Sequence, residues 1–316
     1  MLLSSGSRSI GLRFGGTARG CVRTLMRQID ILERQEQKQR EQQREHCAGT
    51  QLRDPIETSS AMATSYILGV ANSTQNTQWC PKDPLDVQAI SGGIHADKAF
   101  EYSLMALLML ATGMPNQMTN QRAHHWQRSL TPLASTKRVL VVGYGNLGRA
   151  VIRAAKVLGM QVSAINKRGA SASAVDRLVG PSQMDAELKD CDILVLACPL
   201  TDETRHLIGE RQFALLPRGA GLINIARGPI VDSVSLIKFL KAGHLGGAIL
   251  DVFDIEPLTE SSELWDAPNL VLTPHTSCDL PSGYVERSLG ILLRNLERLE
   301  NGERTFENQV SVTLGY

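Results

Sequence analysis

Six short apolar segments recur from residue 138 onwards, and this series constrains the fold more than any other feature of the chain. Each segment is continuously apolar rather than alternating, which is typical of strands covered on both faces of a parallel sheet. Helical or loop segments separate them, and this alternation indicates a doubly wound α/β domain. The predicted strands end at Gly143, Ile165, Ala197, Ala226, Val252 and Thr273.

A glycine-rich turn, GYGNLG, follows the first predicted strand and opens an apolar helix. Gly143, Gly145 and Gly148 have the spacing G-x-G-x-x-G. In that motif the first glycine permits a tight turn, the second lets a pyrophosphate approach the backbone, and the third lets the helix pack closely on the strand. The order strand, turn, helix makes the motif specific, so the sequence predicts a dinucleotide site rather than an ordinary turn.

The residues after the second predicted strand bear on the choice of coenzyme. An acidic residue at this point would bind the ribose 2′-hydroxyl of NAD, but the chain has Asn166, Lys167 and Arg168 there. Two cations suit the 2′-phosphate of NADP instead. We therefore favour NADP(H) over NAD(H); the alternative is that these are merely solvated loop charges.

Three polar residues follow three other predicted strands, at the carboxyl edge where open parallel sheets bind ligands. They are Arg227, Glu256 and His275. Reduction of a 2-oxo acid by hydride needs a proton donor, which a histidine supplies near neutral pH. Glu256 would stabilise the protonated imidazole, and the planar guanidinium of Arg227 would bind carboxylate and carbonyl oxygens.

Each of these residues also has an alternative role. Arg227 would bind a phosphate, Glu256 would cap a loop before a proline, and His275 would be a loop histidine with local partners. The occurrence of all three at strand ends of one nucleotide-binding sheet favours the catalytic interpretation. Asp251 and the pair Cys198 and Pro199 are weaker candidates, for contacts with the nicotinamide carboxamide and with the border of the coenzyme.

Composition limits the remaining possibilities. With 316 residues, 42% of them hydrophobic, the chain can form one large core or two modest ones. Its 33 basic and 32 acidic residues leave a net charge of +1, which predicts a small-molecule partner rather than nucleic acid or an anionic membrane. The longest apolar run, residues 104–111, predicts a buried helix, and the scattered cysteines indicate neither a metal site nor a disulfide framework.

The first 29 residues differ from the rest because they contain five arginines, several serines and no acidic residue. This composition is that of an organellar transit peptide, and we expect a cytoplasmic or a mitochondrial location; a disordered basic arm is the alternative to the transit peptide. Residues 30–46 are almost wholly polar and cannot anchor a core. We therefore expect residues 1–48 to be a leader and a polar linker.

Several motifs in order, from about residue 91 to residue 316, carry a family resemblance. They include VGYGNLGRAVIRAAKVLGMQV, LINIARGPIVD, GGAILDVFDIEPL and LWDAPNLVLTPHTS. This part of the chain resembles the D-isomer-specific 2-hydroxyacid dehydrogenases, which include glyoxylate/hydroxypyruvate reductases and phosphoglycerate dehydrogenase. The resemblance implies hydride transfer between NAD(P)H and a small 2-oxo acid such as glyoxylate or hydroxypyruvate, and a Rossmann domain over residues 101–280.

Matching the family's motifs position by position implies particular site residues. Arg227, Glu256 and His275 match its catalytic arginine, glutamate and histidine, and Arg227 and His275 would also lie against the coenzyme. The resemblance further implies a homodimer joined through the nucleotide-binding domains. The implied coenzyme contacts are Asn146, Leu147, Arg168, Cys198, Pro199, Thr204, Ile225 and Asp251.

The chain departs from the family upstream of residue 91. The family has a flavodoxin-like substrate domain with a glycine-containing loop that holds the substrate carboxylate, and residues 49–90 show no such series of strand, loop and helix. We expect a reduced substrate domain formed by residues 49–100 and 281–316. An alternative function follows, namely an NAD(P)-binding regulatory or interaction protein that does not assemble a complete substrate pocket.

Overall fold

The computed structural model describes residues 93–167, 174–280, 284–303 and 305–308. The predicted leader and linker, and the part of the predicted substrate domain before residue 93, lie outside these residues. Of the described residues, those up to 291 belong with the central sheet in one unit, and residues 292–307 belong to another. The predicted domain boundaries at residues 100 and 281 stay predictions.

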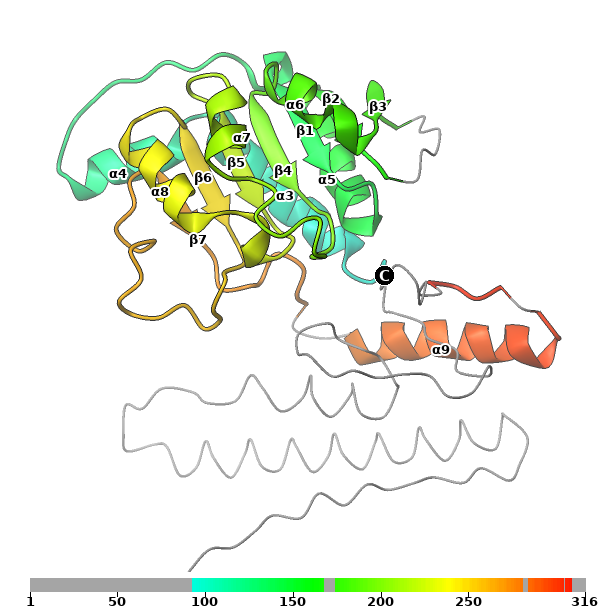
Figure 1. Ribbon diagram of the computed structural model, residues 1–316. Coiled ribbons are helices and arrows are strands. Elements are labelled where there is room, and N and C mark those ends of the chain that lie inside the picture. The colour runs from blue at the N-terminus through cyan, green and yellow to red at the C-terminus, as the bar shows by residue number, and fades with distance from the viewer. Residues whose placement is uncertain (1–92, 168–173, 281–283, 304, 309–316) are drawn as a thin grey trace, which may run out of the picture. The chain divides into compact units, whose positions relative to one another are not determined.

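A single sheet of seven parallel strands organises the first unit (Figure 1). Its order is β3-β2-β1-β4-β5-β6-β7, so the chain winds outward in both directions from a central pair. The doubly wound α/β fold predicted from the sequence is therefore confirmed. The strands are β1 (Arg138–Val142), β2 (Gln161–Ile165), β3 (Arg177–Val179), β4 (Ile193–Leu196), β5 (Gly221–Asn224), β6 (Gly247–Leu250) and β7 (Leu270–Leu272).

The apolar runs form strands because both faces of the sheet are covered. Alternate side chains of a strand point to opposite faces. In β1, Val139 and Val141 join the cluster beneath helices α3 and α5, whereas Leu140 and Val142 join the cluster on the other face. All four are at most 5% exposed, and so every position inside the strand must be apolar.

Helices cover the two faces unequally. On one face lie α3 (Ala96–Ala111) and α5 (Asn146–Val157), which pack against each other as well as on the sheet. The short helices α6 (Met184–Leu188) and α7 (Glu210–Leu215) cover the other face, together with α8 (Ser233–Lys241). This arrangement leaves the carboxyl ends of the strands free to carry polar loops.

Two elements of the sheet unit were not predicted from the sequence. The first is β3, a three-residue strand at the edge of the sheet next to β2. The second is α4 (Met114–Arg122), which forms in a largely polar stretch. After α4, residues 123–133 run along the surface to the short 3₁₀ turn η1 (Ala134–Thr136), and every one of them is exposed. Two further 3₁₀ turns are η2 (Pro181–Gln183) and η3 (Gly228–Ile230).

The helix α9 (Tyr284–Glu300) continues from the first unit into residues 292–307. Within those residues, the side chain of Asn295 bonds both the backbone carbonyl and the backbone amide of Glu307, at 2.9 and 2.7 Å. Arg294 forms a two-point ion pair with the Glu307 carboxylate, which lowers the pKa of that carboxyl group. The end of the helix is thus tied to the segment that follows it.

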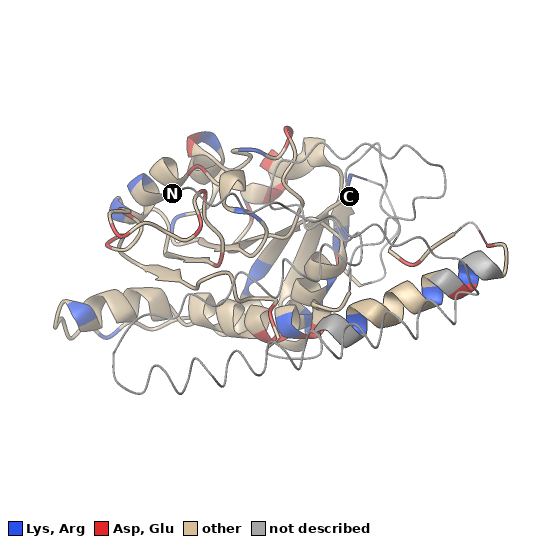
Figure 2. Ribbon diagram, turned by 90° about the horizontal axis from the view of Figure 1, so that it is seen from below, with Lys and Arg blue, Asp and Glu red and all other residues tan. Residues whose placement is uncertain are grey.

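Charged side chains are interspersed rather than segregated on the described surface. In the view of Figure 2, basic and acidic residues lie next to one another along the helices and loops. Within the part of the chain that the structure describes, no helix is both long enough and apolar enough to cross a bilayer.

Candidate functional site

The glycine turn lies between β1 and α5, at the point where the strand order reverses direction. Gly143 has a φ of +108°, and a Cβ there would lie 2.6 Å from the carbonyl oxygen of Ala197. A Cβ on Gly148 would lie 1.9 Å from the carbonyl oxygen of Gly143. Both positions therefore require glycine to build the turn itself.

Gly145 differs from the other two glycines. A Cβ on it would meet no protein atom within 4 Å, and its backbone conformation is open to any residue. Its hydrogen side chain is therefore not required by the packing of the described residues. An outside group that approaches the backbone, such as a pyrophosphate, would account for glycine at this position.

The first turn of α5 faces the same opening. The helix begins at Asn146, and Gly145 at the N-cap offers no side chain to accept hydrogen bonds from the first amides. Uncapped amides and the positive end of the helix dipole together favour an anion. Asn146 is exposed and Leu147 is half-buried, so this end of the helix fits a nucleotide phosphate as the motif predicted.

The predicted contacts for the adenosine end lie on loops after β2 and β4. Asn166 is half-buried directly after β2, and Lys167 is exposed. The Lys167 ammonium forms an ion pair of 2.7 Å with Glu203 from the loop after β4. Arg168 lies outside the described residues. The Lys167–Glu203 ion pair thus joins the loops after β2 and β4 at the place where the ribose 2′-substituent of the coenzyme is expected.

The remaining predicted coenzyme contacts follow β4 and β5. Cys198 is half-buried after β4, and burial raises the pKa of its thiol to about 11, so it stays protonated near neutral pH. Pro199 is exposed. The Thr204 hydroxyl accepts from the Thr201 amide at 2.7 Å and donates to the Pro199 carbonyl at 2.8 Å, which fixes the loop. Ile225 is only 3% exposed.

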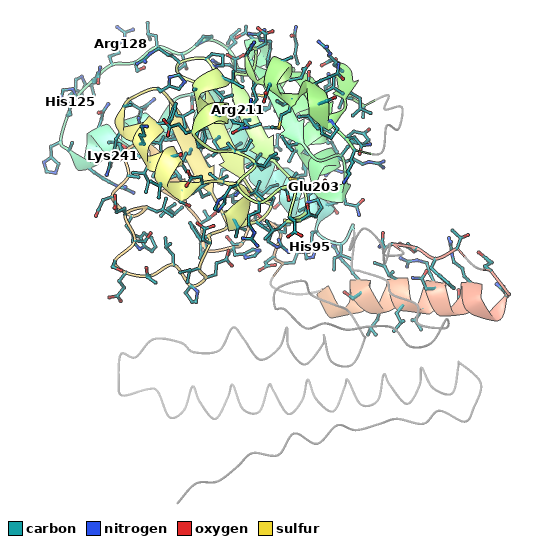
Figure 3. All side chains as sticks on the ribbon, in the orientation of Figure 1. His95, His125, Arg128, Glu203, Arg211 and Lys241 are labelled. Atoms are coloured by element: carbon teal, nitrogen blue, oxygen red, sulfur yellow. The ribbon has the colours of Figure 1, made fainter. Side chains whose placement is uncertain are left out.

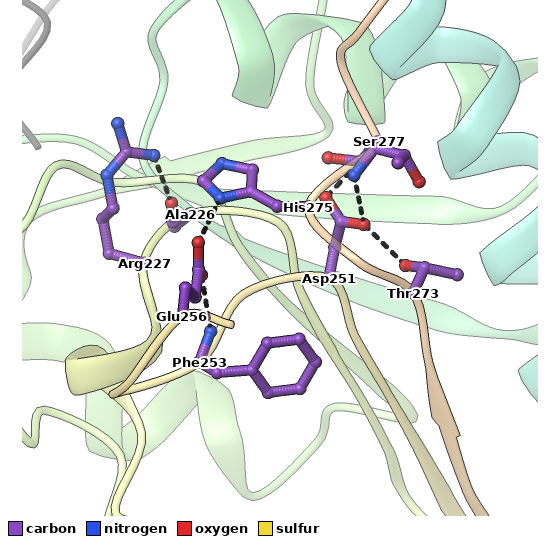
Figure 4. A network of polar contacts seen from close by, with 9 residues as sticks. Ala226, Arg227, Asp251, Phe253, Glu256, Thr273, His275 and Ser277 are labelled. Atoms are coloured by element: carbon purple, nitrogen blue, oxygen red, sulfur yellow. Dashed lines mark hydrogen bonds and ion pairs between the residues drawn. The ribbon is translucent and has the colours of Figure 1, made fainter. Parts of the chain in front are cut away.

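His275 and Glu256 are paired in the structure. The Nδ1 atom of His275 lies 2.7 Å from Oε2 of Glu256, and the other carboxylate oxygen accepts from the Phe253 amide at 2.9 Å (Figure 4). Because an ionised carboxylate can only accept, Nδ1 carries the proton in this bond. Nε2 has no hydrogen-bond partner among the described residues and is the nitrogen left for a substrate.

Arg227 follows β5 and lies near this pair. Its Nη1 donates to the carbonyl of Ala226 at 2.6 Å, which uses only one of its five N–H groups. The next residue, Gly228, contacts the loop after β6 so closely that a Cβ would lie 1.9 Å from the Phe253 carbonyl carbon. Burial raises the pKa of the nearby Cys278 thiol, and the positive charge of Arg227 partly opposes this effect. The structure thus brings Arg227, Glu256 and His275 together.

Asp251 does not lie open to solvent, although the sequence suggested a contact with the coenzyme. It has no exposed surface, and its carboxylate accepts hydrogen bonds from the Thr273 hydroxyl at 2.6 Å and from the amides of Thr276 and Ser277 at 2.9 Å each. In the structure it anchors the loop that carries His275. A contact with the nicotinamide carboxamide stays a prediction.

Sequence reasoning did not single out Thr273, Thr276 or Ser277. Their signal was weak, because hydroxyl residues next to a predicted catalytic histidine are common in loops. Figure 4 shows Thr273 and Ser277 beside the Asp251 carboxylate, on the side of His275 away from Glu256. Within the described residues, no group of three or more His, Cys, Asp or Glu side chains could hold a metal ion.

Residues 104–277 match the family model described as "D-isomer specific 2-hydroxyacid dehydrogenase, NAD binding domain". A glyoxylate reductase of Thermococcus gammatolerans is 39% identical over 167 residues, which are 53% of this chain and 49% of that protein. An (S)-sulfolactate dehydrogenase of Chromohalobacter salexigens is 36% identical over 211 residues, 66% of this chain and 68% of that protein. The chain spans about half the length of the glyoxylate reductases that it matches.

Solved structures give the same result. A D-isomer specific 2-hydroxyacid dehydrogenase from Xanthobacter autotrophicus, in complex with NADPH and MES, superposes with a TM-score of 0.66 and 33% identity over 73% of this chain and 71% of that one. An NADPH-dependent glyoxylate/hydroxypyruvate reductase from Sinorhizobium meliloti, in complex with NADP and sulfate, has a TM-score of 0.65 and 28% identity over 75% of this chain and 74% of that one.

Proposed function

This chain belongs to the D-isomer specific 2-hydroxyacid dehydrogenase family, and from that premise we propose that it reduces a small 2-oxo acid, such as glyoxylate or hydroxypyruvate, with NADPH. The observation that carries the proposal is the His275–Glu256 pair, 2.7 Å apart, with Arg227 next to it at the strand edge that carries the glycine turn. These groups supply the acid, the stabilising carboxylate and the cation that carbonyl reduction needs.

In the proposed reaction, NADPH held at the glycine turn would supply the hydride that reduces the carbonyl carbon of the substrate. His275 donates the Nε2 proton to the carbonyl oxygen, which becomes the hydroxyl of the product. Glu256 holds Nδ1 and stabilises the protonated imidazole before the transfer. Arg227 uses its remaining N–H groups to bind the substrate carboxylate and to orient the carbonyl.

The direct test measures NADPH oxidation by the purified chain with glyoxylate and with hydroxypyruvate, beside nucleotide affinity from fluorescence. We expect saturable oxidation of NADPH with at least one of the two acids. Nucleotide binding without turnover, for these and other small 2-oxo acids, would contradict the proposal. It would favour a coenzyme-binding regulatory or interaction protein.

The preference for NADP(H) is part of the proposal and rests on Asn166, Lys167 and Arg168 after β2. The two solved relatives described above contain NADPH or NADP. Lys167→Ala is expected to raise the KM for NADPH about 10-fold, because it removes one charge-assisted bond to the 2′-phosphate. The KM for NADH should change by less than about twofold, because that ribose carries no phosphate.

Lys241→Ala is the matched control for this experiment. Lys241 is as exposed as Lys167 and also pairs with a glutamate, Glu263, at 3.3 Å, but it lies on α8. The control should leave both KM values unchanged. Equal effects of Lys167→Ala on NADPH and NADH would show that the 2′-phosphate is not bound here.

We propose further that the chain forms a homodimer through the surface of α3 and the exposed segment 123–133. Trp126 in that segment is 98% exposed, Leu130 is 81% exposed, and Met105 and Leu108 on α3 are each 41% exposed. In Figure 3 the labelled His125 and Arg128 mark the outer edge of this segment. Exposed apolar groups of this number are typical of a protein–protein interface, and the family's dimers support a second copy as the occupant.

Replacing both Trp126 and Leu130 with glutamine is expected to weaken the dimer by at least about 100-fold, since large buried aromatics dominate interface energies. Light scattering during size-exclusion chromatography at micromolar concentration would show a monomer for the variant and a dimer for the parent. Val234→Gln is the control, because Val234 is 77% exposed on α8, on the other face of the sheet. A parent that runs as a monomer would contradict the proposal.

A further inference from the structure

A chain of two consecutive hydrogen bonds connects helix α3 to the loop that carries His275. The Tyr102 hydroxyl lies 2.6 Å from the Thr273 hydroxyl, and the Thr273 hydroxyl lies 2.6 Å from Oδ1 of Asp251. Tyr102 is 8% exposed and Asp251 is fully buried. The three residues come from α3, from the end of β7 and from the end of β6.

The direction of this chain follows from its chemistry. A carboxylate can only accept, so the single hydroxyl proton of Thr273 is donated to Asp251. Thr273 has no second proton, and therefore the Tyr102 hydroxyl must be the donor in the other bond. Burial raises the pKa of Tyr102, so its hydroxyl keeps this proton across the physiological range.

Asp251, in turn, holds the turn at His275. Its backbone carbonyl accepts from the His275 amide at 2.9 Å, and its carboxylate accepts from the amides of Thr276 and Ser277 (Figure 4). His275 itself has a φ of +55°, in the left-handed region that residues other than glycine seldom adopt. Surrounding contacts must maintain such a conformation.

A second contact ties the beginning of α3 to the same loop. Nδ1 of His95, the residue that precedes the helix, lies 3.0 Å from the carbonyl oxygen of Cys278. The loop from Thr273 to Cys278 is therefore fastened to α3 at both of its ends, on either side of His275. No sequence pattern indicated that α3 and this loop share contacts.

We infer that Tyr102 and Thr273 are positioning residues, which act through Asp251 to hold His275 in the conformation that presents Nε2 to the substrate. This inference rests on the proposed function for its catalytic consequence. It goes beyond that function because neither residue is expected to touch substrate or coenzyme. The hydrogen bonds from Tyr102 through Thr273 to Asp251 would fix the orientation of the His275 imidazole relative to the substrate.

The test compares Thr273→Val, Thr273→Ser and Tyr102→Phe in the full chain. Thr273→Val is expected to lower kcat by about 10- to 100-fold, because small misplacements of a catalytic group have effects of this size. Thr273→Ser keeps the hydroxyl and should retain kcat within about threefold of the parent. The nucleotide Kd should stay within about threefold for all variants, because the glycine turn is unchanged.

The Tyr102–Thr273 and Thr273–Asp251 hydrogen bonds are linked in series, so the losses of kcat caused by breaking each one should not add. Tyr102→Phe is expected to lower kcat by about three- to 10-fold, and the double variant Tyr102→Phe/Thr273→Val should be no slower than Thr273→Val alone. The inference would be contradicted if the losses of kcat in the two single variants multiplied in the double variant. It would also be contradicted if Thr273→Val left kcat unchanged, or if Thr273→Ser were as slow as Thr273→Val.

Amide hydrogen exchange gives a readout that needs no activity. In Thr273→Val, the amides of Thr276 and Ser277 should exchange about 10-fold faster than in the parent, whereas Leu194 and Ile223 in the central strands should not change. General destabilisation would accelerate the strand amides as well and would overturn the inference. If the parent binds nucleotide but turns over no 2-oxo acid, the proposed function fails. The exchange experiment still decides whether the hydrogen bonds from Tyr102 through Thr273 to Asp251 hold the loop.

Discussion

His275→Gln is expected to lower kcat for 2-oxo acid reduction by about 10³-fold, because general acid catalysis by a placed side chain contributes 10²- to 10⁴-fold. Glutamine fills a similar volume, but its side-chain amide cannot act as a general acid near neutral pH. The nucleotide Kd should stay within about threefold, since the glycine turn that would hold the phosphates is formed by β1 and α5.

The measurement is steady-state oxidation of NADPH, combined with fluorescence titration of the nucleotide. His275 has a positive φ, so His275→Asn, which tolerates this backbone region better, serves as a second variant. Loss of activity in both variants assigns the effect to the imidazole and not to backbone strain. Lys241→Ala, an exposed change on α8, is the control. Full turnover in both His275 variants would rule out the proposed role.

The second large effect is expected in the glycine turn, where two substitutions should separate binding from folding. Gly145→Ala places a methyl group where no protein atom lies within 4 Å, so stability should be unchanged. The methyl group would occupy the space proposed for the pyrophosphate. We expect the nucleotide Kd to rise about 100-fold, which corresponds to roughly 2.7 kcal/mol.

Gly148→Ala should act in the opposite way. Its methyl group would lie 1.9 Å from the Gly143 carbonyl oxygen, so helix α5 must move away from the turn. We expect a loss of about 1–3 kcal/mol in the free energy of unfolding, as for other overpacked sites. Denaturant unfolding and nucleotide titration on both variants check the pair. Unchanged affinity in Gly145→Ala would show that no phosphate lies against the turn.

Most strands, and the site residues that follow them, were predictable from the sequence because apolar runs and strand ends are local patterns. Six apolar runs form six of the seven strands, and the rule that ligands bind at the carboxyl edge of a parallel sheet predicts that Arg227, Glu256 and His275 lie near one another. The seventh strand was not predictable. In β3 only Val179 is buried, so a run of three residues that begins with an exposed arginine carries almost no pattern.

Helix α4 was missed for a different physical reason. Its sequence is polar, and its formation depends on tertiary contacts that periodicity does not record. Gly113 enters the helix with a φ of +68°, Pro115 is buried against Gly247, and the Thr119 hydroxyl accepts from the Asn269 amide at 2.8 Å. These partners are far apart in the chain.

The contact between Tyr102 and Thr273 was also beyond sequence reasoning. The two residues are 171 positions apart, and each has an ordinary explanation, Tyr102 as a core aromatic and Thr273 as a loop hydroxyl. Only the fold brings both of them to Asp251. The same applies to the His95 contact with Cys278, since these two residues are 183 positions apart.

The glycine turn, the arginine and the acid–base pair all project from one rim of one sheet, between residues 143 and 275. The proposed proton donor and the proposed coenzyme site are therefore built on the same sheet. A domain brought to that rim could be exchanged for another to change which acid is accepted, without rebuilding the reaction. Modular chimeras that join this half to the carboxylate-binding half of a relative are, on this view, a practical route to reductases with new selectivity.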